Sequence, residues 1–185
     1  VAHFAQEAIK QQVIPAVLAG EKRISLGITE PSGGSDVANI ITTATRDGDH
    51  YIVNGSKTFI SGVMGADWVS TAVRTGGEGG RGVSMLLIPT HLPGVGRTPL
   101  DRKQGWWCAD TGTIYFDNVR VPADHLIGEE GQGFLVIMSN FNPERISLAV
   151  TMEAASRACL EDAVNWAQER KPLASGWLTI RLSGI

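Results

Sequence analysis

The hydrophobic and polar positions of the 185-residue chain change their spacing twice. From Val1 to Val13, apolar residues recur at the spacing of an amphipathic helix, and Pro15 is expected to end that helix before a short turn. From Arg23 to Pro122, short β-branched runs alternate with Gly, Asn-Gly and Pro. From Phe134 to Arg170 the chain is almost free of helix breakers. The pattern therefore predicts a helix, a β domain and a second helical region.

The central region predicts an antiparallel β-barrel or sandwich, and the incomplete helical segments on either side make the fold class α+β. Asp47-Gly48-Asp49 is typical of a hairpin turn, whereas Asn54-Gly55 indicates a second bend or a bulge. The glycine-rich stretch 76–82 has no helix after it, which argues against a dinucleotide fingerprint and favours a mobile loop. The predicted strands are Ile24–Thr29, Ile40–Arg46, Tyr51–Asn54, Lys57–Ser61, Trp68–Arg74, Val83–Pro89, Thr113–Phe116 and Val119–Val121.

The helical region after the β domain contains one proline, Pro143, so we expect either two collinear helices or one kinked helix. Asn142 before Pro143 has the order of an N-cap residue and a first helical residue, which favours a fresh start there. The predicted domains are residues 1–22, the end of a helical domain, 23–127, the middle β domain, and 128–185, the start of a helical bundle. Both ends of the chain fall inside such patterns, so we expect it to be cut at both ends.

Composition narrows the possible partners. A hydrophobic content of 43% with 19% charged residues excludes a disordered chain. The chain has 16 Lys and Arg against 19 Asp and Glu and no basic block, which argues against a nucleic-acid partner. No window reaches the roughly 20 apolar residues of a membrane span, and no targeting segment is recognisable. Cys108 and Cys159 have no His at ligand spacing, so we expect reduced thiols and no metal site.

Two stretches of the β region could bind a ligand. In "ISLGITEPSGGSDV", the paired glycines let backbone N–H groups approach a ligand and Ser35 adds a hydroxyl, which would suit a diphosphate. A Gly-Gly turn capped by Asp36 explains the same residues without a ligand. Phe59 and Ser61 face the same side of a strand and could hold a planar ring with a polar rim, although core packing is the commoner role of such a pair.

Glu144 is the candidate for proton transfer. In a helix that starts at Asn142, no Lys or Arg lies three, four or seven residues after it, and a carboxylate facing apolar packing holds its proton more tightly, as a general base requires. The alternative is a first-turn Glu stabilised by the helix dipole. Arg145 points elsewhere and is either an anchor for an anionic ligand or a solvated side chain.

Four stretches, in this order, resemble the FAD-dependent acyl-CoA dehydrogenase family. "ITEPSGGSDV" and "YIVNGSKTFISG" are similar to its two middle-domain signatures, "KQGWWCADTGTIYFDNVRVP" to the run that closes that domain, and "GEEGQGFLVIMSNFNPERISLA" to the entry into its helical bundle. After Arg170 the sequence "KPLASGW" departs from the family pattern. The resemblance implies FAD as the cofactor and assigns these residues to it: Leu26, Ile28, Thr29, Gly34, Ser35, Phe59, Ile60, Ser61 and Arg170.

Within that assignment, Thr29 would hydrogen-bond to the ring edge of the flavin and Gly34 and Ser35 would meet its diphosphate. The resemblance also implies an acyl-CoA substrate, with Ser35, Asn142 and Arg145 at the CoA moiety. Glu144 lies where the isovaleryl and long-chain branches carry their base, whereas most other branches take it from a later segment.

The reaction implied by the resemblance is α,β-dehydrogenation. A carboxylate removes the α proton of the thioester while the β hydride passes to the flavin, which leaves a trans-2-enoyl-CoA. Electron-transfer flavoprotein is the implied acceptor, a homodimer or homotetramer the implied assembly, and bacterial cytoplasm or mitochondrial matrix the implied location. Two alternatives remain: an acyl-CoA oxidase or nitroalkane oxidase on the same fold, and a non-catalytic β domain used for assembly.

Overall fold

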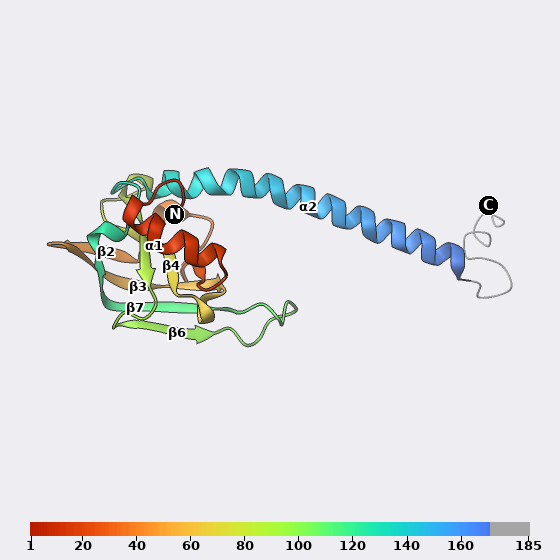
Figure 1. Ribbon diagram of the computed structural model, residues 1–185, viewed down its shortest axis with the longest axis horizontal. Helices are drawn as coiled ribbons and strands as arrows, with labels where there is room; N and C mark the ends of the chain where they lie inside the picture. Colours follow the sequence, from red (N-terminus) through yellow and green to blue (C-terminus); the bar gives the residue numbers. More distant parts are fainter. Residues whose placement is uncertain (171–185) are drawn as a thin grey trace. The chain divides into compact units, whose positions relative to one another are not determined.

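The computed structural model describes residues 1–170, which fall into two compact units, the first ending at Met138 and the second starting at Ser139. The first unit contains helix α1 and one eight-stranded sheet (Figure 1). The second contains the greater part of helix α2. The part of the predicted third domain that follows Arg170 lies outside the described residues.

Helix α1 spans Glu7–Leu18, so the prediction that Pro15 ends a helix beginning at Val1 is wrong. A proline removes only its own N–H donor, and the carbonyl of Pro15 still accepts the amide of Ala19 at 2.9 Å. The helix stops before Gly20, which has a φ of 74° and reverses the chain. The residues before Glu7 are not helical because Ala5 forms a β-bridge with Ile127.

The strands form one sheet in the order β6-β7-β3-β2-β4-β5-β8, with β1 paired to β4. The α+β class is confirmed, but the sheet is not closed, so the barrel form of the prediction is wrong. The pairing is antiparallel except that β1 and β2 each run parallel to β4. The strands are β1 (Ile24–Gly27), β2 (Thr43–Asp47), β3 (His50–Ser61), β4 (Trp68–Arg74), β5 (Val83–Pro89), β6 (Val95–Pro99), β7 (Thr111–Pro122) and β8 (Leu126–Ile127).

The predicted turns are found where the sequence places them. Asp47 pairs with His50, so Gly48 and Asp49 form the tip of the β2–β3 hairpin. At Gly55 the pairing of β3 with β7 shifts register, as expected for a bulge. Gly55 has a φ of 139°, and a Cβ there would lie 2.7 to 2.9 Å from Thr42, so both backbone conformation and space require glycine.

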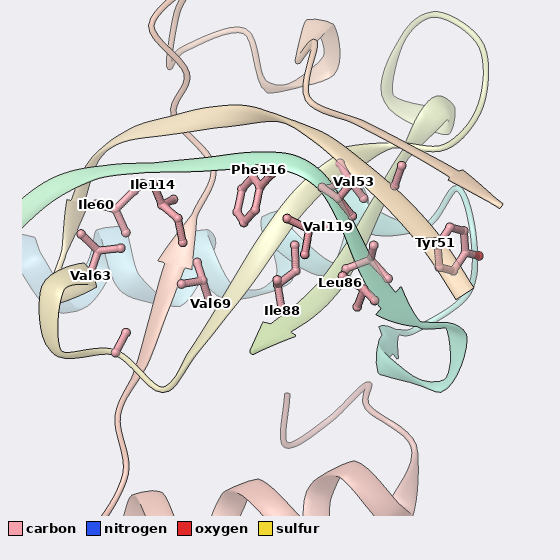
Figure 2. Close-up of a cluster of buried hydrophobic side chains, with 14 residues drawn as sticks. Tyr51, Val53, Ile60, Val63, Val69, Leu86, Ile88, Ile114, Phe116 and Val119 are labelled. Atoms are coloured by element: carbon pink, nitrogen blue, oxygen red, sulfur yellow. The ribbon is translucent and has the colours of Figure 1, made fainter. Parts of the chain in front are cut away.

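Alternating side chains of the long strands form the core (Figure 2). Strand β5 is buried at every position, whereas β3 buries every second residue in its first half, beginning with Tyr51 and Val53. The buried residues of the cluster are Ala44, Tyr51, Val53, Ile60, Val63, Ala66, Val69, Val73, Leu86, Ile88, Ile114, Phe116, Val119 and Val121. Near the end of β3, Ile60 is buried, whereas its neighbours Phe59 and Ser61 are exposed.

Helix α2 spans Gly133–Glu169 without interruption and contains Pro143, so the predicted fresh start at Asn142 is wrong. The helix is already formed before Pro143, and that residue needs no N-cap. In the second unit most side chains are exposed among the described residues, including the apolar Ile146, Leu148, Val150, Met152, Leu160, Val164 and Trp166. No helix within residues 1–170 is long and apolar enough to cross a membrane.

Candidate functional site

The two segments predicted to flank a planar ring lie side by side. The hydroxyl of Ser25 in β1 donates to the carbonyl of Ser61 at 2.8 Å. The amide of Thr58 in β3 donates to the carbonyl of Thr29 at 2.9 Å. These bonds join residues more than 25 positions apart, so the end of β1 and the end of β3 form one surface of the first unit.

The exposed side chains of this surface alternate with buried ones. Leu26 is 42% exposed and Phe59 is 62% exposed, and Thr29 is half-buried. Ile28 and Ile60 are only 6% and 3% exposed. Both isoleucines were predicted as ring contacts, and the structure places both among the buried hydrophobic residues.

The exposure of Phe59 results from a bulge in β3. Lys57 pairs with Ile114 and Ile60 pairs with Gly112, so two residues of β3 lie opposite Thr113 alone. Phe59 itself has a φ of 59°, which a bulky non-glycine residue rarely adopts. Strain of this kind is concentrated at ligand sites, and here it turns a large aromatic side chain out of the core.

The turn after Ser61 is held from both sides. The carboxylate of Asp110 accepts the amides of Met64 and Gly65 at 3.1 and 3.3 Å. One nitrogen of the Arg97 guanidinium donates to three carbonyls of the same turn, including that of Val63 at 3.0 Å. The turn therefore fixes the carboxyl end of the segment that carries Phe59.

A tight loop follows Thr29. Glu30 and Gly33 exchange backbone hydrogen bonds of 3.0 Å in both directions. A Cβ at Gly34 would lie 3.0 Å from Cγ2 of Thr29 and 3.2 Å from its hydroxyl, whereas a Cβ at Gly33 would meet nothing within 4 Å. The absence of a side chain at Gly34 therefore lets the loop lie against Thr29, with Gly34 and Ser35 both exposed.

The proposed cap at Asp36 does not form. The Asp36 side chain makes no capping bond to the backbone and instead accepts the side-chain amide of Asn39 at 2.7 Å. The loop is held instead by a residue that the sequence reasoning missed, Glu30, whose side chain is 1% exposed. Its partner Lys57 is 0% exposed, and Lys57 Nζ lies 2.8 Å from Glu30 Oε1.

Burial and the hydrogen bonds of this pair shift the pKa of each group in opposite directions. Burial lowers the pKa of Lys57 to about 8, against the hydrogen bond and the charge of Glu30, which raise it. Burial also raises the pKa of Glu30, but hydrogen bonds from Lys57, Thr42 and Ile41 together outweigh it, so the pKa of that carboxyl is lowered overall. One signal in the sequence could have identified the pair: Lys57 continues the inward alternation of Tyr51 and Val53, so its charge needs a buried partner.

The candidate catalytic residues lie in the second unit. Asn142, Glu144 and Arg145 are all exposed among the described residues. The side-chain amide of Asn140 donates to Glu144 Oε2 at 3.4 Å, and no apolar packing covers that carboxylate within the described part of the unit. Because α2 begins at Gly133, Glu144 is not in its first turn, and the dipole explanation for this residue is wrong.

The remaining residues singled out from the sequence are Arg170 and the two cysteines. The guanidinium of Arg170 lies 5.9 Å from the ring centre of Trp166. Cys108 and Cys159 are free and exposed. Residues 1–170 contain no cluster of three or more His, Cys, Asp or Glu that could hold a metal. A separate cavity of about 320 Å³ has the Lys22–Asp67 ion pair in its lining, and none of the predicted cofactor residues lines it.

Comparison with known proteins identifies relatives of both units. Residues 25–119 match the family model described as the acyl-CoA dehydrogenase middle domain, and residues 131–175 match the acyl-CoA dehydrogenase C-terminal domain. The acyl-CoA dehydrogenase AFT10-1 of Alternaria alternata is 41% identical over 184 residues, which cover 97% of this chain and 42% of that protein. The mitochondrial isobutyryl-CoA dehydrogenase of Dictyostelium discoideum is 38% identical over 169 residues, or 91% of this chain and 41% of that protein.

The fold agrees with these matches. The crystal structure of a "probable acyl CoA dehydrogenase" from Mycobacterium abscessus superposes with a TM-score of 0.92 at 45% identity. The match covers 98% of this chain and 49% of that one. The chain thus spans less than half the length of each of these three relatives.

Proposed function

The chain belongs to the acyl-CoA dehydrogenase family, and from this premise we propose that the complete protein is a flavoprotein oxidoreductase that converts an acyl-CoA thioester to the trans-2-enoyl-CoA. The observation that carries the proposal is the surface shared by the ends of β1 and β3. There an exposed aromatic ring, Phe59, and the half-buried Thr29 come from segments joined by hydrogen bonds. We further propose that residues 23–127 are the middle domain of such an enzyme, between parts of two helical domains, 1–22 and 128–185.

Membership of the family implies a flavin cofactor, and we propose FAD. The residues present suit it: Phe59 and Leu26 offer apolar surface to a planar ring, and the hydroxyl of Thr29 can bond to a polar ring edge. Gly34 lacks the side chain that would push the loop away from Thr29, which leaves backbone N–H groups of the loop open to a diphosphate. Arg170 would meet the FAD of a neighbouring subunit in a homodimer or homotetramer.

The chain's own residues would bind and deprotonate the substrate. Ser35, Asn142 and Arg145 would hold the CoA moiety, with Arg145 attracting its phosphates. Glu144 would accept the α proton, which a carboxylate can do once the site excludes water. FAD, when bound, supplies the acceptor for the β hydride. Electron-transfer flavoprotein is the proposed acceptor of the electrons, and bacterial cytoplasm or mitochondrial matrix the proposed location.

The absorption spectrum of the purified protein tests the cofactor directly. Oxidised flavin should be visible after purification or after addition of FAD, and the Thr29→Val variant should shift that spectrum while leaving the fold unchanged. Thr43→Val, which alters an exposed threonine of β2, is the matched control. A protein that binds no FAD would instead support the non-catalytic assembly role.

A second measurement, on the complete protein, tests which acyl chain is preferred and whether oxygen accepts the electrons. Anaerobic addition of acyl-CoA thioesters of increasing length should bleach the flavin, and the fastest thioester identifies the preferred chain. Rapid reoxidation of the reduced flavin by dissolved oxygen would favour the oxidase alternative over the dehydrogenase.

A further inference from the structure

We propose that the buried pair Glu30–Lys57 is a positioning device that fixes the loop carrying Thr29, Gly34 and Ser35 against the strand carrying Phe59. The inference rests on the proposed function, because it assigns these two residues the task of preorganising the FAD surface. Neither residue is placed in direct contact with the cofactor.

The pair lies between the two segments that form the surface. Glu30 directly follows Thr29, and Lys57 precedes Phe59 by two residues. Besides its 2.8 Å contact with Glu30, Lys57 Nζ donates to the carbonyl of Ile28 at 3.2 Å. One ammonium group thus joins β3 to the chain on both sides of Thr29, and any movement of that chain would break one of its bonds.

The carboxylate of Glu30 closes the loop at its other end. Oε2 accepts the amide of Ile41 at 2.7 Å, and Oε1 accepts the amide of Thr42 at 2.8 Å. Thr42 is itself fully buried, and its hydroxyl donates to the carbonyl of Ser56 at 3.2 Å. Both oxygens of a single carboxylate therefore fix the far end of a loop whose near end is Glu30 itself.

Stability alone does not explain a charged pair at this place. A buried ion pair contributes little net stability compared with well-packed apolar side chains, because both charges lose their hydration. An apolar side chain at position 30 could accept neither amide, which would leave the amide of the fully buried Thr42 without this partner. The pair is therefore suited to holding one loop geometry, and a preformed loop binds its ligand without first having to be ordered.

The test compares three variants with the wild type. Lys57→Met removes the ammonium group. Glu30→Gln replaces one of the two accepting oxygens with an NH2 group, which cannot accept a backbone amide. The double variant removes both charges, in case a single unpaired charge prevents folding. Val121→Ala is the control, because it opens the core at the opposite end of β3, where Val121 pairs with Tyr51. It lowers stability without touching the loop.

We expect the affinity for FAD to fall about 10-fold or more in the pair variants, as it would if only a tenth of the molecules had the ordered loop. The flavin spectrum at saturating FAD should also shift. Val121→Ala should keep both properties even where its melting temperature falls as far. Pair variants that fold and bind FAD with wild-type affinity and spectrum would overturn the proposal.

Hydrogen exchange in the apoprotein separates this proposal from the proposed function. The amides of Ile41 and Thr42 should exchange faster in the pair variants than in Val121→Ala, and equal protection would overturn the loop-closing role. A wild-type protein that binds no FAD would overturn the proposed function, while exchange at these two amides would still decide whether the pair closes the loop.

Discussion

The stability of the protein should rise with pH between about 8 and 10.5 relative to a Lys57→Met variant. Burial lowers the pKa of Lys57 in the folded protein from 10.5 to about 8. Between these values the unfolded chain binds a proton at Lys57 that the folded protein has released, and stability rises with pH wherever the unfolded state binds more protons. Below pH 8 and above pH 10.5 both states carry the same charge at this residue, so the slope vanishes.

The size of the effect follows from the same two values. Each pKa unit corresponds to about 1.4 kcal/mol, so a lowering from 10.5 to about 8 gives a gain in the free energy of unfolding of about 3 to 4 kcal/mol across the interval. Lys57 is 0% exposed, so solvent does not screen this contribution. Other groups that titrate at alkaline pH are shared by wild type and variant and cancel in the difference.

Urea unfolding at several pH values measures this difference. Trp68 is 9% exposed in β4, and its fluorescence should report the loss of the sheet. Lys22→Met controls for the loss of one positive charge at an exposed position. A difference that stays flat up to pH 10.5 and then declines would refute the reasoning, because it would mean that attraction to Glu30 outweighs burial and raises the pKa of Lys57.

Three further outcomes are expected. Gly34→Ala should weaken FAD binding several-fold, because the added Cβ would press on Thr29. Gly33→Ala, which has open space around its Cβ, should leave FAD binding unchanged. Equal effects of the two variants would refute the steric argument. Because the folded-state pKa of Glu30 is lowered from 4.5, the advantage of wild type over Glu30→Gln should shrink as pH falls below that value in the same urea experiment. In the complete enzyme, Glu144→Gln should slow flavin reduction by acyl-CoA by about 10²-fold and retain FAD binding. Glu161→Gln on the same helix should leave the rate of flavin reduction unchanged. An unchanged rate in Glu144→Gln would mean that another residue is the base.

The sequence predicted most accurately the strands whose own residues carry a strong β pattern. Strands β4 and β5 were predicted to the residue because they are runs of mainly β-branched and apolar residues, with Asp67 before and Arg74 at the end of the first and Gly82 before and Pro89 at the end of the second. Strand β6, with the sequence VGRTP, has little apolar character and exists because it pairs with β7, which no local pattern reveals. The two predicted pieces of β3 form one strand because the extra residue of the register shift near Gly55 lies in β7, where Asp117 and Asn118 face Asn54, so β3 continues through the glycine.

The candidate site was predictable in its residue types and less so in their orientations. Phe59 and Ser61 are both exposed, but regular alternation from the buried Lys57 would have turned Phe59 inward; the bulge and the left-handed backbone at Phe59, which the sequence pattern does not reveal, turn it outward. The burial of Ile28 depends on strand pairing and core packing, which the motif alone does not reveal, and its ring contact stays a prediction. The side chain of Glu30, in the loop after β1, is buried and accepts the amides of Ile41 and Thr42.

The candidate residues divide between the two units, so the proposed cofactor binding and the proposed catalysis would depend on different units. Every predicted FAD contact except Arg170 lies in the first unit, and Glu144, Asn142 and Arg145 all lie in the second. Flavin affinity should therefore respond to changes around Thr29 and Phe59 even when the second unit is altered. Under the proposed mechanism turnover would need both units, because the α proton would pass to Glu144 in the second unit and the hydride to a cofactor bound mainly by the first. A protein that binds FAD normally but cannot be reduced by any acyl-CoA would thus point to the second unit, where the carboxylate of Glu144 is exposed within the described residues. Exclusion of water strengthens the electrostatic interactions of a reacting carboxylate, so under the proposed mechanism any segment that covers Glu144 should raise the rate of proton transfer.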